Sequence, residues 1–365
     1  MAAGAVVKVL VTRTDRLGDL VLSLPAMALL KQARPDWEIH AMVAPACLPL
    51  VEHLDFLAGV WTWQPGGDGC DSRSLGHDLA RASFDAAIML QYRRELALLL
   101  RRAGVARLYG PRSRFTSWFL LNHGLRQQRS RSNRHEMELN GDLARSALSS
   151  PGLPLDPPWL QLSAQQKEQG EAFRASRAAG AETVAFVHPG SGGSALDWQP
   201  DRFAAVANAL ASRTGWRVFV TGAGADAALV DAVAVGLRPE VGVLLDAFDL
   251  RTFMGVLAAG DVLVGPSTGP LHMAPALGLA AVGLYPPVPT MAPSRWGPRG
   301  RWVDTIVPAV DCPAVRKCPG RRCRLYNCLH EIEAADVVAA AVTLQSRRRL
   351  ELATAAAERI RKETT

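Results

Sequence analysis

The stretch 262–278 combines a turn of small residues with a histidine, a pattern that suits anion binding. Ser267, Thr268 and Gly269 follow a short apolar run and precede a longer one that predicts a helix. Uncovered backbone N–H groups at the helix start and the helix dipole attract a phosphate, and His272 lies one turn further along. The alternative is an ordinary strand-to-helix connection in which the Ser-Thr pair caps the helix and His272 belongs to the core.

A carboxylate near the amino terminus has the placement of a general base. Asp19 follows Gly18 directly, after the apolar run 6–12, at the carboxyl end of a strand, where open α/β sheets bind their ligands. A carboxylate exposed there can take a proton from a bound hydroxyl, or it can cap the following helix. Asp15 has the same two interpretations and is the less favoured base.

Two polar loops in the second half also follow predicted strands. Ser191 and Gly192 lie in a Gly-Ser-rich loop after the run 183–187, where N–H groups can bind a pyrophosphate. Asp226 ends the stretch 222–226, which follows the run 216–221 and is similar to a dinucleotide-binding turn. The next strand is not clearly followed by the acidic residue that a dinucleotide site needs. A nicotinamide-dependent oxidoreductase is therefore a minor alternative.

These residues are positioned by two successive sets of alternating strands and helices. The first half predicts strands at 6–12, 37–43 and 84–90, a helix at 20–32, and helical patterning with polar breaks to 148. The second half predicts strands at 183–187, 216–221, 241–245, 261–264 and 280–285, with helices at 200–213, 250–259 and 269–277. The alternation indicates an α/β protein with doubly wound sheets.

The length of 365 residues suffices for about two domains. The Ser- and Pro-rich run 149–158 has the composition of a linker. The expected organisation is an N-terminal domain at 1–150, a linker at 151–163, a C-terminal domain at 164–332 with a Cys-rich loop at 312–330, and a helix and tail at 333–365. The tail is too weakly apolar to predict membrane insertion.

The composition is that of a soluble globular protein, with 48% hydrophobic and 21% charged residues. No apolar run has the length of a membrane span and no signal peptide pattern is present, so a cytoplasmic location is expected. The net charge of +7 predicts acidic partners. Arginines concentrate in one stretch of the first half, namely Arg93, Arg94, Arg101, Arg102, Arg107, Arg112, Arg114, Arg126, Arg129, Arg131 and Arg134.

This arginine-rich stretch predicts either a solvated basic face or a patch for phosphate or lipid headgroups. Nucleic acid is not an expected partner, because the chain has no zinc-finger spacing, no aromatic ribonucleoprotein motif and no basic region followed by heptads.

Four cysteines lie within 17 residues, at Cys312, Cys318, Cys323 and Cys328. Five, four and four residues separate them, so the C-x-x-C pairs of common zinc sites are missing. A reducing cytoplasm disfavours structural disulfides. Free thiols in a compact loop are the favoured interpretation; a structural metal site is the alternative, and redox pairing is the third.

Five stretches resemble glycosyltransferase family 9, whose members are the lipopolysaccharide heptosyltransferases. They are 13–25, 84–88, 187–191 with Trp198, 222–226 and 267–272, in the order of the family. The resemblance spans roughly residues 6–332, and the combination of the first and last motifs is specific. It implies the GT-B architecture, in which two Rossmann-like domains face a central cleft, with the acceptor on the first and a nucleotide sugar on the second.

The resemblance also implies a reaction. Members of the family transfer a heptose, typically from ADP-heptose, with inversion and without a catalytic metal or other cofactor. The implied acceptor is a lipopolysaccharide core or another lipid-linked, anionic glycan at the cytoplasmic face of the membrane, with peripheral contact to anionic lipid.

Residue by residue, the resemblance implies that Asp19 is the catalytic base. The implied donor-binding residues are Ser191, Gly192, Asp226, Ser267, Thr268, Gly269 and His272. Among them, Thr268, Gly269 and His272 would hold the pyrophosphate and Asp226 the ribose. We expect the acceptor to be bound by Arg13, Arg16, Arg93 and Arg94.

Two positions depart from the family pattern. Leu196 stands where many members have a lysine near the donor phosphates, and Ser267 stands where the family has an aspartate. Because both changes alter polar groups near the donor, the identity of the donor stays open. Arg202 and Arg295 are candidates to replace the missing charge. The main alternative function is a non-catalytic homologue that binds anionic glycolipid through its arginines.

Overall fold

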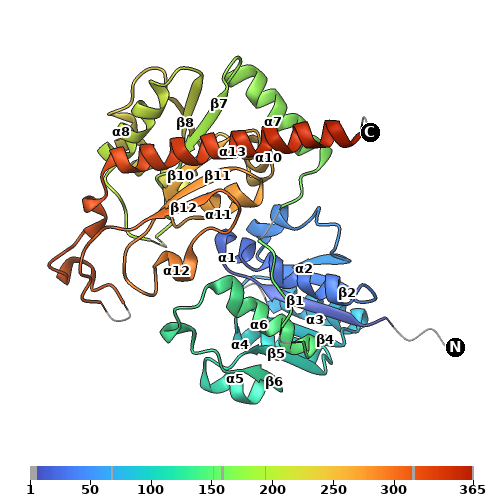
Figure 1. Cartoon of the computed structure of the whole chain (residues 1–365). Coiled ribbons are helices and arrows are strands. Elements are labelled where there is room, and N and C mark those ends of the chain that lie inside the picture. Colours follow the sequence, from blue (N-terminus) through green and yellow to red (C-terminus); the bar gives the residue numbers. More distant parts are fainter. Residues whose placement is uncertain are drawn as a thin grey trace. The chain divides into compact units, whose positions relative to one another are not determined.

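The computed structural model describes residues 6–66, 69–150, 152–157, 160–193, 195–314 and 317–363. The chain forms two compact units, Met1–Gln161 and Leu162–Thr365. Each unit contains one six-stranded sheet, and every strand pair in both sheets is parallel. Helices flank each sheet (Figure 1), which is the arrangement of a doubly wound α/β fold.

The sheet of the first unit has the order β3-β2-β1-β4-β5-β6. Its strands are β1 (Lys8–Arg13), β2 (Glu38–Val43), β3 (Gly59–Thr62), β4 (Ala86–Met89), β5 (Arg107–Pro111) and β6 (His123–Leu125). Its helices are α1 (Leu17–Val21), α2 (Leu24–Ala33), α3 (Gly69–Ala82), α4 (Arg94–Arg102), α5 (Phe115–Leu120) and α6 (Glu136–Leu148), with short 3₁₀ turns η1 (Pro45–Leu50) and η2 (Arg129–Arg131). The strand order reverses between β1 and β4, which makes their carboxyl ends the expected ligand edge.

The sheet of the second unit has the order β12-β11-β10-β7-β8-β9. Its strands are β7 (Thr183–Val187), β8 (Trp216–Gly222), β9 (Gly242–Leu245), β10 (Val262–Pro266), β11 (Ala280–Leu284) and β12 (Val303–Ile306). Its helices are α7 (Ala164–Arg177), α8 (Pro200–Ala211), α9 (Ala227–Ala234), α10 (Leu250–Ala258), α11 (Gly269–Ala276), α12 (Pro293–Trp296) and α13 (Ala334–Glu363), with 3₁₀ turns η3 (Gly224–Asp226), η4 (Gly320–Arg322) and η5 (Cys328–Glu331). Here the order reverses between β10 and β7.

The apolar runs of the sequence become the central strands because those strands are covered on both faces. All residues of β7, β10 and β11 are buried, and so are five of the six residues of β1. In the second unit the core also takes in Trp198 and Phe203, whose rings meet edge to face at 4.9 Å. Large buried side chains thus fix the strand ends from which the polar loops begin.

Two sequence expectations for the first unit were wrong. The single helix expected at 20–32 is two helices, α1 and α2, which meet around Ser23, with Pro25 in the first turn of α2. Proline has no N–H, so it suits a helix start and not a helix interior. The stretch expected to be helical up to 148 also contains the short strands β5 and β6. Three to five residues are too few to show a strand period.

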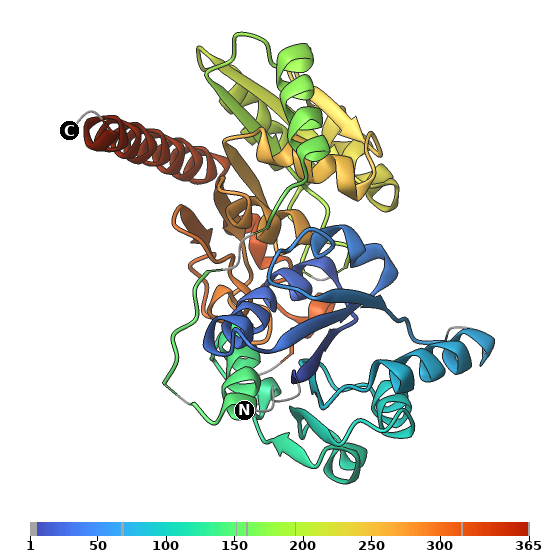
Figure 2. The same ribbon diagram turned by 90° about the vertical axis from the view of Figure 1, so that its right-hand side faces the viewer.

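The C-terminal helix α13 packs on the second unit with its first half only. Val337, Ala341 and Leu344 join the core, and the Arg348 guanidinium donates to the Asp261 carboxylate at 2.8 Å. Beyond Glu351 the helix is exposed and extends past the other elements of its unit (Figure 2). Among the helices in the described parts of the chain, none is long and apolar enough to cross a membrane.

Candidate active site

Asp19 lies at the ligand edge of the first unit, in the first turn of α1 directly after β1. The N-cap residue of α1 is Arg16, and no side chain forms a capping hydrogen bond there. Asp19 therefore does not act as the helix cap that the sequence left open. Its side chain is 18% exposed, so the carboxylate is partly desolvated and still reachable.

The carboxylate of Asp19 is paired with Arg13, the last residue of β1. The guanidinium of Arg13 also donates to Asp15 at 2.7 Å and to Glu136 at 3.1 Å, and its side chain is only 2% exposed. One buried cation thus serves three carboxylates. Because the Arg13 guanidinium already donates to three carboxylates and is buried, its position favours holding Asp19 in place over direct contact with an acceptor.

Glu136 and Asn140, both on α6, accept hydrogen bonds from Arg13 and also from Arg129. Arg129 donates to Glu136 at 2.5 Å and to Asn140 at 3.2 Å. Asn140 is fully buried, and its amide donates to the Ser23 hydroxyl, which in turn donates to the backbone carbonyl oxygen of Asp19 at 2.7 Å. The network therefore reaches Asp19 through both its side chain and its backbone.

The pKa of Asp19 is raised above its ordinary value. The first cause is burial, which disfavours the charged form; Arg13 opposes it, while Asp15 and Glu136 add to it. A base works best when its pKa approaches the working pH, so the shift suits proton abstraction. The nearby Cys47 has its pKa raised to about 12 by burial and then by Asp15 and Asp19, which keeps it a neutral thiol.

The other predicted acceptor arginines follow the same strand ends. Arg16 precedes α1 and is exposed, and Arg94 is the exposed first residue of α4, which comes after β4. Arg93 is half-buried, and its Nε donates to the Gln91 amide oxygen at 2.8 Å. Because β1 and β4 are neighbours in the sheet, Arg16, Arg93 and Arg94 follow the carboxyl ends of adjacent strands at one edge of the sheet. Their contact with an acceptor stays a prediction.

In the second unit, the turn after β10 lies against the turn after β7. A Cβ atom on Gly265 would come within 2.7 Å of the His188 carbonyl oxygen, and the His188 N–H donates to the Val264 carbonyl oxygen at 2.8 Å. This close approach requires glycine at 265. It also brings the residues around Ser267 next to the loop that contains Ser191, at the point where the strand order reverses.

Thr268 is the N-cap residue of α11, and its side chain forms no capping hydrogen bond. The capping interpretation of the Ser-Thr pair is thus not what the structure shows. The Ser267 hydroxyl instead bonds with Tyr285, whose fully buried hydroxyl donates to the Trp296 carbonyl oxygen at 2.7 Å. Gly269 begins the helix, and His272 is buried in its first turn.

The loop after β7 is shaped by its own side chains. The Ser191 hydroxyl donates to the Asp197 carboxylate at 3.1 Å and accepts from the Gly193 N–H at 3.2 Å. Gly192 and Gly193 have φ values of 54° and 71°, a left-handed conformation that glycine adopts without strain. Ser191 is therefore a residue that builds the loop as well as a candidate donor contact. Ser194, at the loop end, lies outside the described residues.

Asp226 ends the turn after β8 and faces the loop after β7. A Cβ atom on Gly190 would collide with the Asp226 carboxyl group, so these two residues are in close contact. One carboxylate oxygen of Asp226 accepts from the Ala223 N–H at 3.1 Å, and the side chain is partly exposed. A carboxylate in this place can accept hydrogen bonds from two neighbouring ribose hydroxyls.

His188 is buried between these loops as a neutral side chain. Burial lowers its pKa to about 4, with Asp226 partly opposing the shift, and its Nδ1 lies 2.9 Å from the Thr221 hydroxyl. An ordinary histidine in an unfolded chain has a pKa near 6.5, so between about pH 6.5 and pH 4 the unfolded chain binds more protons than the folded one.

We therefore predict that the free energy of unfolding falls by about 3 kcal/mol as the pH drops through that window because of His188 alone. A His188→Asn variant keeps a polar partner for Thr221 and cannot titrate. Urea unfolding of both proteins at pH 7 and pH 4.5 measures the difference. Equal pH dependence in the two proteins would show that His188 does not contribute.

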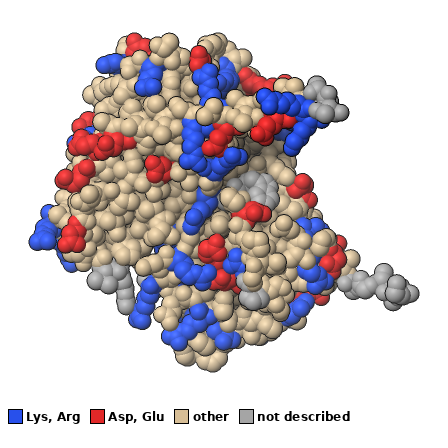
Figure 3. Space-filling view, viewed as in Figure 1, with Lys and Arg blue, Asp and Glu red and all other residues tan. Residues whose placement is uncertain are grey.

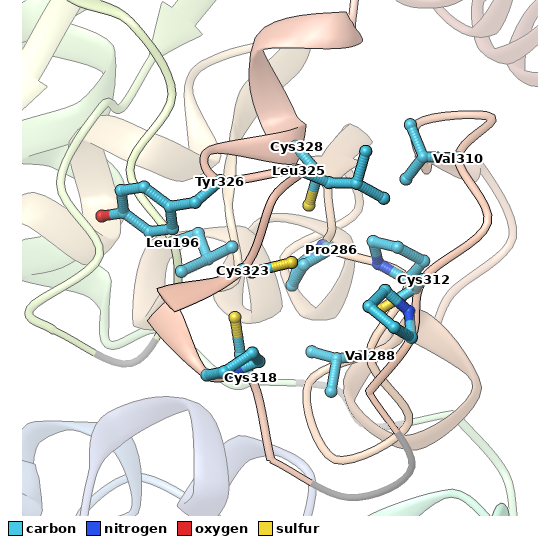
Figure 4. Close-up of a pocket in the computed structure, with 13 residues that line it drawn as sticks. Leu196, Pro286, Val288, Val310, Cys312, Cys318, Cys323, Leu325, Tyr326 and Cys328 are labelled. Carbon is cyan, nitrogen blue, oxygen red and sulfur yellow. The ribbon is translucent and has the colours of Figure 1, made fainter. Parts of the chain in front are cut away.

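The four clustered cysteines line one pocket in the second unit, together with Leu196 and Tyr326 (Figure 4). All four are free thiols, and among the described residues no group of three or more His, Cys, Asp or Glu side chains is arranged to hold a metal ion. Arg316, in the same loop, lies outside the described residues.

Leu196, at the position of the family lysine, points into this apolar pocket (Figure 4). The Asn327 amide donates to the Asp197 carbonyl oxygen at 2.5 Å, so the Cys-rich loop supports the loop that contains Ser191. Leu196 thus packs the loop that contains Ser191 against the Cys-rich loop and brings no charge to that loop.

Of the two arginines considered as replacements for that charge, Arg202 forms an ion pair with Glu333 at the surface of α8. Arg295 is buried on α12, which follows β11 at the ligand edge of the sheet. The location of Arg295 makes it the better candidate for a donor contact.

The model of glycosyltransferase family 9 (heptosyltransferase) matches residues 72–317. The chain belongs to glycosyltransferase family 9. A candidate glycosyltransferase from Haemophilus influenzae is 29% identical over 304 residues, which cover 80% of this chain and 86% of the relative.

Solved structures of family 9 enzymes share the fold. The family 9 glycosyltransferase from Veillonella parvula superposes with a TM-score of 0.79 at 19% identity, covering 93% of this chain and 97% of its own. Escherichia coli ADP-heptose lipopolysaccharide heptosyltransferase II superposes with a TM-score of 0.77 at 22% identity, covering 94% of this chain and 99% of its own. The expected GT-B-type fold is confirmed, and the protein is a glycosyltransferase.

The sequence did not predict several residues that lie in or next to the candidate site. Glu136 and Asn140 are more than 120 positions from Arg13 along the chain, and no local sequence pattern predicts their contact with Arg13. Their spacing of four residues on one helix was the available signal. His188 lies within the stretch 187–191, and its place directly after β7 was the available signal for a position at the ligand edge.

Proposed function

We propose that this family 9 enzyme transfers a heptose from ADP-heptose to a lipopolysaccharide core or a related anionic, lipid-linked acceptor at the cytoplasmic membrane face. The observation that carries the proposal is the assembly at the carboxyl ends of β10, β7 and β8. There the Ser267–Gly269 turn, the Gly190 loop and Asp226 gather polar groups suited to a pyrophosphate and a ribose.

In the proposed reaction, Asp19 accepts the proton of an acceptor hydroxyl while that oxygen attacks the anomeric carbon of the donor. The bond between that carbon and the diphosphate oxygen breaks in the same step, so the configuration inverts and ADP leaves. A single displacement needs one base. The raised pKa of Asp19 and its fixed position beside Arg13 support this role.

The departing diphosphate gains negative charge, which must be stabilised. We assign this task to the N–H groups at the start of α11 and to His272, with no catalytic metal. N–H donors that already point at the diphosphate before the reaction need no rearrangement as negative charge develops there. We also infer that Met1–Gln161 binds the acceptor and Leu162–Thr365 the donor.

Nucleotide binding tests the donor site. We predict that ADP binds selectively over UDP, GDP and CDP in titration calorimetry. Gly190→Ala should weaken ADP binding by about tenfold, because its Cβ must displace the Asp226 carboxyl group. His272→Ala should also weaken it.

The matched control is Gly152→Ala, since no atom lies within 4 Å of the Cβ that it would add. Its ADP affinity should equal that of the wild type. Selective binding of another nucleoside diphosphate would keep the transferase and replace the donor, whereas unchanged ADP affinity in Gly190→Ala and His272→Ala would refute this placement of the site.

Family membership removes the support for a nicotinamide-dependent oxidoreductase. The same membership counts against the alternative of a homologue that only binds anionic glycolipid. Such a protein would bind the acceptor and release no ADP from the donor.

A further inference from the structure

Helix α5 exposes three aromatic side chains on one face of the first unit. Phe115 is 78% exposed, Trp118 49% and Phe119 68%. Their spacing of three and four residues places them on the same side of the helix, and the rings of Phe115 and Phe119 meet edge to face at 5.0 Å. A large apolar patch open to water is uncommon on soluble proteins and marks a contact surface.

The opposite side of α5 is firmly attached to its unit. Ser117 is fully buried and its hydroxyl donates to the Arg114 carbonyl oxygen at 2.5 Å, while the Tyr92 hydroxyl donates to Thr116 at 2.8 Å. Leu121, directly after the helix, belongs to the core. The aromatic face is therefore presented by an ordered helix, so the rings are not exposed by fraying.

Two arginines contact this aromatic helix, and arginines are frequent in the sequence on both sides of it. Between Leu96 and His135 the sequence has no Asp or Glu and nine arginines, namely Arg101, Arg102, Arg107, Arg112, Arg114, Arg126, Arg129, Arg131 and Arg134. Arg101 donates to the carbonyl oxygens of Leu120 and Phe119 at 3.0 and 3.4 Å, and the Arg112 guanidinium lies 4.9 Å from the ring centre of Trp118.

Part of this positive charge is available to a partner. Arg102, Arg114 and Arg126 are exposed, and none forms an ion pair with a carboxylate in the described parts of the chain. Lys and Arg side chains gather at the α5 end of the first unit, at the lower edge of the view in Figure 3. A partner that fits this surface therefore combines negative charge with an apolar layer that can bury the aromatic rings.

We propose that α5 and the arginines around it form a membrane-docking surface that inserts Phe115, Trp118 and Phe119 into the interface of an anionic bilayer. Aromatic rings bury there at the boundary between headgroups and acyl chains, and arginines bind the lipid phosphates. Charge complementarity selects a bilayer over a second copy of this chain, because two copies would bring like-charged faces together.

The inference builds on the proposed function, in which the acceptor is lipid-linked. Vesicle binding is nevertheless measured without donor or acceptor, so a failure of either proposal can be told from a failure of the other. Docking at this surface would hold the first unit at the membrane that contains the acceptor.

Co-sedimentation with phosphatidylcholine vesicles, with and without phosphatidylglycerol, tests the surface. The wild type should bind only the phosphatidylglycerol vesicles, and the double variant Phe115→Ser/Phe119→Ser should lose about tenfold or more of that affinity. Because both rings are exposed, its thermal unfolding should match that of the wild type. Val235→Ser, at a residue 89% exposed in the second unit, is the matched control and should bind as the wild type.

The charge is tested separately by Arg102→Gln/Arg114→Gln/Arg126→Gln, which should bind phosphatidylglycerol vesicles more weakly and with less dependence on salt. Wild-type affinity of the double Phe variant, or no binding of the wild type to anionic vesicles, would overturn the proposal. So would sedimentation equilibrium showing a wild-type dimer that the double Phe variant dissolves, since a second copy would then cover this face.

Discussion

Replacing Asp19 with asparagine is expected to slow the proposed heptose transfer by about a thousandfold and to leave the affinity for ADP unchanged. Asparagine keeps an oxygen for Arg13 and loses the ability to take a proton. The loss should appear in kcat, because the base acts only in the transition state. Initial rates of ADP release, together with calorimetric titration of ADP, measure both quantities.

Asp15 provides the matched control for this prediction. Its carboxylate also pairs with Arg13, and it is 11% exposed, close to the 18% of Asp19. Asp15→Asn should therefore retain turnover to within about tenfold, since it changes the same network without removing the base. If Asp15→Asn lost turnover and Asp19→Asn kept it, the base would be Asp15.

Removing the buried cation is expected to have the largest effect on stability. Arg13→Met leaves Asp15, Asp19 and Glu136 without their shared partner, and breaking a buried ion pair in this way costs about 3–5 kcal/mol. The pKa of Asp19, which burial raises and Arg13 lowers, should then lie further above its value in the unfolded chain. The folded variant would bind more protons than the unfolded one, so its deficit should shrink as the pH falls.

Substitutions in the network of charges around Asp19 are expected to shift the pH dependence of kcat/KM. The groups that face Asp19 are Arg13, Asp15, Glu136 and the neutral Cys47. Glu136→Gln removes a negative charge that raises the pKa of Asp19, so the acid limb of kcat/KM should move to lower pH. Arg13→Met should move it to higher pH, provided that enough folded protein remains.

Glu138→Gln is the control for this shift, because Glu138 lies on the same helix, is 38% exposed and pairs with Arg145 at 3.5 Å. Its profile should match the wild type. If Glu136→Gln left the acid limb in place while Asp19→Asn abolished turnover, Asp19 would remain the base and the electrostatic role of Glu136 would be refuted.

The sequence predicted the elements that position the candidate site because those elements are continuous apolar runs. The expected strand 183–187 is β7 itself, and the expected helix 269–277 differs from α11 by one residue. Four short strands were not predicted. They are β3, β5, β6 and β12, which are three to five residues long and each contain an exposed residue. Their conformation depends on pairing with a neighbour already in the sheet.

Part of the candidate site could be predicted because its residues follow strands that the sequence predicts. Asp19, Asp226 and the Ser267–Gly269 turn lie in the segments that follow strands, and parallel strands bring their carboxyl ends to one edge. The pairing of Arg13 with Glu136 joins residues 123 positions apart, which no local pattern shows. That pairing shows Arg13 as the partner that holds Asp19, while its contact with an acceptor stays a prediction.

The measurement that tests this account most directly is mass spectrometry of a truncated lipopolysaccharide acceptor after incubation with ADP-heptose and the purified protein, with ADP release followed in parallel. The account predicts that each acceptor gains one heptose for each ADP released, and that the Asp19→Asn protein shows neither change above background. Acceptor that binds but gains no sugar, with ADP-heptose left intact, would contradict catalysis, and a gain from a different nucleotide sugar would contradict the donor.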